Sequence, residues 1–213
     1  MGNAGLLYVG AVLFLNGLLL LGKVEAKAGA VFNLFVGTLQ VITPTYLIMT
    51  AQGDTHQILS ASGLYLFGFT YLYVGIGLLA GLDTTGVGYF SLFVAIAALG
   101  YSFANFHLLG DPSFGVIWLY WAFLWFLFYL LLGLKREALT SYTGWVTAIQ
   151  GWVTGAIPAF LLLCGYWTHP TEAAIALGVF AVVVFGCLWP ITRRGGPPSR
   201  SPDAANTADA QGG

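Results

Sequence analysis

Seven stretches of about 20 apolar residues follow one another along this chain, separated by short links that contain polar residues, Gly or Pro. A helix needs about 20 such residues to cross the ~30 Å hydrocarbon layer, because each backbone polar group must be bonded within the segment. Only 7% of the 213 residues are charged, whereas soluble domains usually reach about a quarter. The chain is therefore predicted to be an all-α integral membrane protein.

The expected spans occupy most of the chain and leave no room for a separate soluble domain. The first has neither a positive leader nor a small-residue cleavage site, so we expect a retained helix. Residues 193–213 are rich in Gly, Pro, Ser, Ala and Asp, which predicts a disordered cytoplasmic tail. The expected spans are 4–22, 28–50, 57–81, 88–109, 113–134, 144–167 and 171–192.

The distribution of Lys and Arg predicts the orientation. Short cytoplasmic loops carry the excess of these residues. With the N-terminus outside and the C-terminus inside, all seven cations are cytoplasmic. The net charge of −1 also offers no basic surface for nucleic acid. The cations follow spans 1, 5 and 7, at Lys23, Lys27, Lys135, Arg136, Arg193, Arg194 and Arg200.

The first six spans contain a weak threefold repeat. The ends of spans 1, 3 and 5 resemble one another, at Leu20-Leu21-Gly22, Leu79-Ala80-Gly81 and Leu131-Leu132-Gly133. Units of two spans keep the same sense across the bilayer, so the repeat predicts a six-helix bundle of three parallel helical hairpins around a pore. Residues 1–170 then form a channel domain, and residues 171–192 form an additional, peripheral transmembrane helix.

No span has a charged residue in its middle, although charges at that depth usually mark ion or proton pathways. A permeant should therefore be neutral. The three histidines, His56, His107 and His169, lie at or near the outer ends, which argues against a membrane-buried haem. No cluster of His, Asp and Glu or activated nucleophile is expected at membrane depth, so we predict no cofactor, no metal site and no enzyme.

Two amide side chains are expected at a common depth. Asn16 and Gln150 each lie six residues from the inner end of a span, or about 9 Å. Amides offer both a donor and an acceptor to a neutral polar solute. Interhelical bonding explains each residue alone about equally well. In span 6, Gly151 and Gly155 form a small face suited to close helix contact, which leaves the polar face of Gln150 and Thr154 to line the path.

Aromatic residues lie on one face of span 5 at offsets of three and four. Indoles are common at membrane interfaces, but two of these three lie near the middle of the span. Such stripes are typical either of a packed bundle core or of a narrow slot that accepts planar molecules and repels hydrated ions. The candidate stripes are Trp118, Trp121 and Trp125 in span 5, Phe67 and Tyr71 in span 3, and Leu6, Val9 and Leu13 in span 1.

Several runs in spans 1 to 6 resemble the AmiS/UreI family of urea channels and short-chain amide transporters, with the amide-transporter branch most similar. The Leu66-Phe67-Gly68-Phe69-Thr70-Tyr71-Leu72-Tyr73 run and the spaced Trp face are its most specific parts. Further matching runs are Leu6-Leu7-Tyr8-Val9-Gly10 with Asn16-Gly17, Asn33-Leu34-Phe35-Val36-Gly37, Tyr89-Phe90-Ser91-Leu92-Phe93-Val94-Ala95 and Gly151 to Pro158.

The resemblance implies a six-helix protomer with its own pore, assembled as a homohexamer in membrane lipid. The aromatic and aliphatic stripes above would then form its constrictions. Gln150 replaces a glutamate of the urea-channel branch, which favours the amide branch. The short outer link at 52–57 replaces a long, histidine-bearing loop of acid-gated members, so strong acid gating is not expected.

The function predicted from the sequence is a passive channel for urea and short-chain aliphatic amides. The alternative is a proton-coupled secondary transporter of small amides, and a structural membrane protein without flux ranks third. The absence of a mid-membrane carboxylate favours the channel over the coupled transporter.

Overall fold

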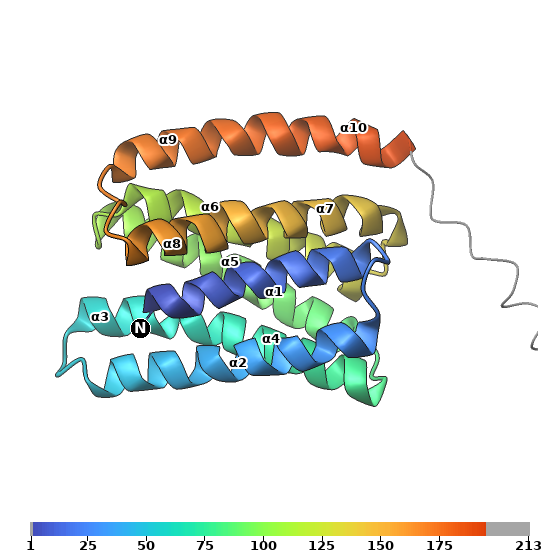
Figure 1. Cartoon of the computed structure of the whole chain (residues 1–213), viewed down its shortest axis with the longest axis horizontal. Helices are drawn as coiled ribbons and strands as arrows, with labels where there is room; N and C mark the ends of the chain where they lie inside the picture. Colours follow the sequence, from blue (N-terminus) through green and yellow to red (C-terminus); the bar gives the residue numbers. More distant parts are fainter. Residues whose placement is uncertain (1, 195–213) are drawn as a thin grey trace, which may run out of the picture.

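The computed structural model describes residues 2–194. Seven of its helical stretches are long and apolar enough to cross a membrane, which confirms the predicted number (Figure 1). The helices are α1 (Gly2–Leu20), α2 (Ala26–Met49), α3 (Thr55–Ser62), α4 (Leu64–Ala80), α5 (Thr85–His107), α6 (Pro112–Phe128), α7 (Thr140–Gln150), α8 (Ile157–Leu163), α9 (Pro170–Phe180) and α10 (Gly186–Arg194).

The spans begin and end close to the expected residues, except for the sixth. This span, Glu137–Leu163, starts seven residues earlier than expected. Its first turns are polar, but the Thr140 hydroxyl donates to the Glu137 carbonyl at 2.7 Å, and the Thr147 hydroxyl donates to the Thr143 carbonyl at 2.6 Å. Because these hydroxyls bond within their own helix, the polar stretch continues the span.

The sixth span contains a π-helical turn, η3 (Gly151–Ala156), in its middle. Pro158 follows two residues later and has no backbone N–H to offer the carbonyl of Thr154, four residues earlier. A local π-turn is one way in which a helix adjusts to such a lost bond. The turn lies against α1, so it also shapes the interior of the bundle.

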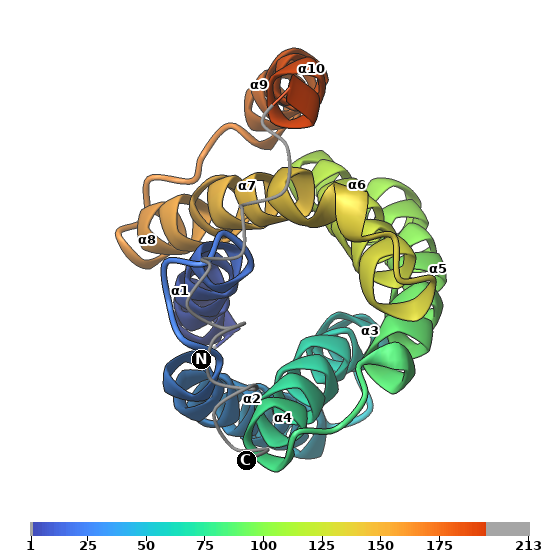
Figure 2. The ribbon, with the colours of Figure 1, turned by 90° about the vertical axis from the view of Figure 1, so that its right-hand side faces the viewer.

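The first six spans form a ring when viewed along the bundle axis (Figure 2). The closest packing occurs between successive hairpins rather than within them: α2 lies against α4, α5 against α6, and α1 against the sixth span. Small residues permit these contacts. A Cβ atom on Gly155 would lie 2.5 Å from the Cα atom of Gly10, and one on Gly37 would lie 2.8 Å from the backbone N of Leu72.

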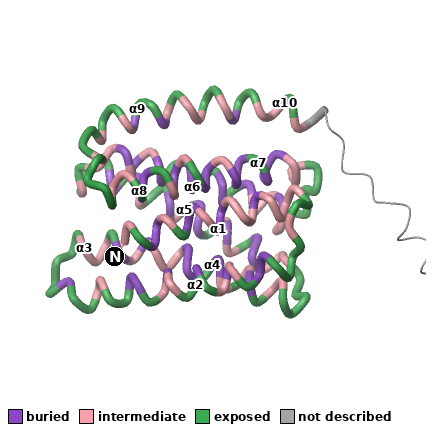
Figure 3. Tube along the Cα trace, in the orientation of Figure 1, coloured by how far each residue is buried: buried purple, intermediate pink, exposed green. Residues whose placement is uncertain are grey.

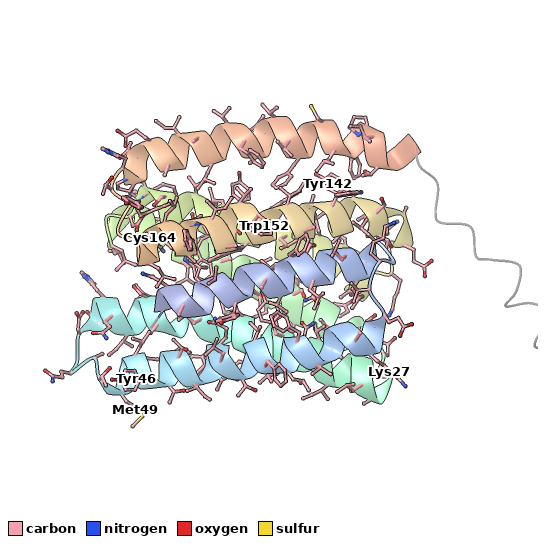
Figure 4. All side chains as sticks on the ribbon, viewed as in Figure 1. Lys27, Tyr46, Met49, Tyr142, Trp152 and Cys164 are labelled. Atoms are coloured by element: carbon pink, nitrogen blue, oxygen red, sulfur yellow. The ribbon has the colours of Figure 1, made fainter. Side chains whose placement is uncertain are left out.

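The seventh span, formed by α9, the π-turn η4 (Ala181–Phe185) and α10, lies outside this ring beside α6 and α7 (Figure 2). Few of its residues are buried (Figure 3). The Tyr120 hydroxyl of α6 donates to the Leu177 carbonyl at 2.5 Å, and Tyr142 of α7 donates to the Phe185 carbonyl at 3.2 Å. Tyr142 thus lies between α7 and the seventh span (Figure 4).

The expected tail at 193–213 falls largely outside the described residues, because α10 continues to Arg194 and the description ends there.

Candidate functional site

A cavity of about 130 Å³ lies inside the ring and extends inward from one end of the bundle. Its rim includes Leu82 and Asp83, in the turn between α4 and α5, and its deepest residues include Tyr71 and Trp125. Trp125 lies eight residues before Gly133, the last residue of the fifth span, so the cavity reaches about 12 Å inward. Its walls are mostly apolar and are contributed by α1, α4, α5 and α6.

The cavity ends at Trp125, which belongs to a group of four packed aromatic side chains. We call this group the aromatic cluster and define it as Phe67, Trp118, Trp121 and Trp125. All four are buried. The ring of Phe67 lies edge-to-face with Trp121 at 4.7 Å and with Trp125 at 5.0 Å between centroids. Trp118 and Trp121 also meet edge-to-face, at 4.9 Å. Edge-to-face arrangements are favourable for aromatic pairs, so the four side chains of the cluster pack tightly against one another.

Each indole of the aromatic cluster also contacts a different span. The Trp121 Nε1–H donates to the Thr154 hydroxyl at 3.0 Å, and the Trp125 Nε1–H donates to the Thr70 hydroxyl at 3.2 Å. Trp118 instead stacks on Tyr101 of α5, with ring centroids 4.6 Å apart and planes 19° apart. The three indoles of α6 therefore connect it to the sixth span, to α4 and to α5.

The aliphatic stripe of α1 faces the same interior. Leu6, Val9 and Leu13 are all buried, and Leu13 contributes to the cavity wall. Their burial matches the inward face expected of them. The small face of the sixth span packs as predicted, since Cβ atoms on Gly151 and Gly155 would lie within 3 Å of α1 backbone atoms.

The two amides expected to act together have different surroundings. Asn16 lines the cavity and forms a reciprocal pair with Asn33 of α2, with N–O distances of 2.9 and 2.7 Å. Asn33 also donates to the Gly29 carbonyl at 2.9 Å. The carboxamide of Gln150 is fully buried and has no hydrogen-bond partner among the described residues, and Gln40 of α2 is in the same situation.

An ion pair lies at the open end of the cavity. The Lys135 ammonium is 3.0 Å from the Asp83 carboxylate and donates to the Thr84 hydroxyl at 2.8 Å. It thereby connects the turn after α4 to the turn after the fifth span. Hydrogen bonds from the Thr85 hydroxyl and backbone N–H, together with Lys135, hold the pKa of Asp83 well below its usual range.

Three residues that the sequence did not single out contact side chains that were predicted to line the path. Thr70, Tyr101 and Asn33 each hold a predicted side chain in place, and Thr70 also lines the cavity. Thr70 and Asn33 lie within the runs that carry the family resemblance, but their partners lie on other helices. Tyr101 had no signal of its own, because a tyrosine in an apolar span is usually interfacial or packed.

A profile of the AmiS/UreI family of transporters matches residues 1–166, which is more than three quarters of the chain. The chain belongs to the AmiS/UreI family.

Within this family, two relatives named as transporters share more identity with the chain than the urea channel of Helicobacter pylori does. A Rhodococcus erythropolis protein assigned as transporter AmiS2 is 57% identical, over 86% of this chain and 90% of its own length. A Mycolicibacterium smegmatis protein assigned as a transporter of amidate substrates is 54% identical, over 93% of each chain. The second alignment covers more of the chain than the family profile does.

The acid-activated urea channel of Helicobacter pylori is a more distant relative. It is 37% identical over 76% of this chain and 97% of its own length. A solved structure of the Helicobacter pylori urea channel in the closed state superimposes with a TM-score of 0.72 and 33% identity, and covers 79% of this chain and all of the channel. The alignment with the acid-activated channel runs over 191 positions, but only 76% of the 213 residues of this chain take part in it. The channel therefore has residues within the aligned region that this chain lacks.

Proposed function

We propose that this protein is a passive channel for urea and short-chain aliphatic amides across the bacterial cytoplasmic membrane. The observation that carries the proposal is a mostly apolar cavity that ends at a buried aromatic cluster within a ring of six spans. Such walls cannot replace the hydration shell of an ion, whereas a small planar neutral solute loses much less on leaving water.

Two further observations support short-chain amides as solutes of this channel. The relatives named as transporter AmiS2 and as a transporter of amidate substrates share 57% and 54% identity with this chain, against 37% for the urea channel. A carboxamide also replaces the glutamate of the urea-channel branch at Gln150, so no ionisable group is expected at that depth. We infer that acetamide and its near homologues pass together with urea. The proposal assigns no enzymatic activity to the chain.

The path would be lined by the predicted residues in three groups. The aromatic cluster and Tyr71 would exclude hydrated ions, the α1 stripe would complete the apolar wall, and the amides would offer hydrogen bonds. We propose as lining residues Leu6, Val9, Leu13, Asn16, Phe67, Tyr71, Trp118, Trp121, Trp125 and Gln150, with Thr154 behind the cluster.

Stopped-flow swelling of proteoliposomes tests this function. Purified protein should accelerate the entry of acetamide and urea down their own gradients and without a pH gradient, while mannitol and NaCl remain excluded. Liposomes without protein set the baseline. Uptake that requires a proton gradient and is abolished by a protonophore would support the proton-coupled secondary transporter instead.

We propose that acid does not strongly gate this channel. The outer link between α2 and α3 spans only residues 50–54, and the Asp54 carboxylate accepts the backbone N–H groups of His56 and Gln57 at 2.9 and 3.2 Å. A link that is short and capped in this way leaves little that could move between open and closed positions.

We further propose an N-terminus outside, a C-terminus inside, and assembly as a homohexamer. Lys23, Lys27 and the Asp83–Lys135 pair lie at the same end of the bundle, which supports a cytoplasmic location for that end. Residues 1–170 would form the channel domain, and residues 171–192 would add the peripheral span. Native mass spectrometry in lipid nanodiscs tests the stoichiometry, and cysteine labelling from either side tests the orientation.

A further inference from the structure

Two threonine hydroxyls hold two indoles of the aromatic cluster in the same way, although they lie on different spans. The Thr70 hydroxyl accepts the Trp125 N–H and donates its own hydrogen to the Leu66 carbonyl at 2.7 Å. The Thr154 hydroxyl accepts the Trp121 N–H and donates to the Gln150 carbonyl, also at 2.7 Å. Each hydroxyl is thus the middle of a chain from indole N–H to hydroxyl to backbone carbonyl.

Both chains are buried. Thr70 is 5% exposed, and Thr154 and Trp125 are completely buried. A hydroxyl has one hydrogen and an indole has one N–H, so both donors in each chain are already used. Away from water, the hydrogen bonds of such a chain polarise and strengthen one another. The indoles therefore cannot turn without leaving a buried donor without a partner, which is unfavourable.

The orientation of the indoles decides what a solute meets at the aromatic cluster. With both N–H groups directed at threonines, Trp121 and Trp125 offer ring surface but no donor. A solute then interacts weakly as it passes, and conduction requires binding that is weak enough for release. An indole N–H that was free to turn inward could instead bind the carbonyl oxygen of an amide.

We propose that Thr70 and Thr154 are positioning residues for permeation, which hold the two indole N–H groups in hydrogen bonds and so keep Trp121 and Trp125 from offering a donor to the solute. This inference rests on the proposed function. It assigns to Thr70 a role that its place in an apolar run does not indicate. It also gives Thr154 a role behind the cluster rather than direct contact with the solute.

The test uses Thr70→Val and Thr154→Val, which keep the side-chain shape but remove the acceptor. Each variant should lower the half-saturating acetamide concentration about 2- to 10-fold, the range expected for one net hydrogen bond, and should lower the maximal flux. Thr70→Ser and Thr154→Ser retain the hydroxyl and should restore wild-type flux. Reduced maximal flux with an unchanged half-saturating concentration, or equal loss in the Ser variants, would overturn the proposal.

Thr147→Val is the matched control. Thr147 is also fully buried in the sixth span and donates to the carbonyl four residues earlier, at 2.6 Å, but no indole of the described residues donates to it. It should therefore change neither flux parameter. A change as large as that of Thr154→Val would show that any buried threonine of the span has this effect, and would also overturn the proposal.

A second measurement does not depend on transport. In detergent-solubilised protein labelled with ¹⁵N-tryptophan, Thr70→Val should shift the indole N–H resonance of Trp125 and accelerate its hydrogen exchange roughly tenfold. Thr154→Val should do the same to Trp121. Unchanged indole resonances would refute the two hydrogen-bonded chains. If these signals respond but the wild-type protein passes neither acetamide nor urea, the proposed function fails while the positioning geometry stands.

Discussion

The contact between α5 and the inner end of the fifth span makes a quantitative prediction for Gly88→Ala. A Cβ atom there would lie 2.7 Å from the Leu132 carbonyl carbon and closer still to the backbone of Gly133. Ordinary contacts of this kind begin at 3.4 Å, so the two helices must separate by about 0.7 Å or more. Backbone cannot move aside as a flexible side chain does. Overpacking of this kind typically costs about 1–3 kcal/mol.

Gly100→Ala on the same helix provides the control. Gly100 has open space where its Cβ would lie, and both variants gain the better helix propensity of alanine, so their difference isolates the contact. Gly88→Ala should therefore be less stable than Gly100→Ala by about 1–3 kcal/mol in the free energy of unfolding. The measurement is unfolding of the detergent-solubilised protein with increasing SDS mole fraction, followed by tryptophan fluorescence. If the two variants differ by less than about 0.5 kcal/mol, the reasoning about this contact is refuted.

Three further predictions concern selectivity, stability and pH. Trp125→Ala should open the aromatic cluster, so the ratio of butyramide to acetamide flux should rise several-fold; an unchanged ratio at normal expression would leave Trp125 with a packing role alone. Gln40→Met removes a buried amide that has no partner in the part of the chain that the structure describes, and should raise stability by about 1–3 kcal/mol in SDS unfolding; an accompanying loss of amide flux would instead place Gln40 in the path. Acetamide flux should stay nearly constant between pH 5 and 7.5, because the depressed pKa of Asp83 keeps its carboxylate charged there, and its contribution to stability is lost only as the pH falls far below this window. A several-fold rise on acidification that disappears when His56 and His107 are both replaced by Gln would contradict this.

The membrane architecture could be predicted from the sequence because each span is encoded locally. A run of about 20 apolar residues satisfies its own backbone as a helix wherever its neighbours lie, so seven runs predicted seven spans. The inward faces of α1 and α6 were also predictable, because residues spaced three and four apart lie on the same face of any helix. The start of the sixth span was missed because the residues before Gly144, such as Thr140, look polar in the sequence, whereas the Thr140 hydroxyl bonds to its own helix.

The tertiary structure alone decided which side chains meet. Asn16 and Gln150 have similar depths, yet Asn16 bonds to Asn33 on the neighbouring helix, because side-chain hydrogen bonds depend on the rotation of each helix as well as on depth. Thr70 and Trp125 lie 55 positions apart, and neither shows in the sequence that it bonds to the other. Helix formation requires only near neighbours along the chain, whereas these contacts require two helices to pack at one distance and one rotation.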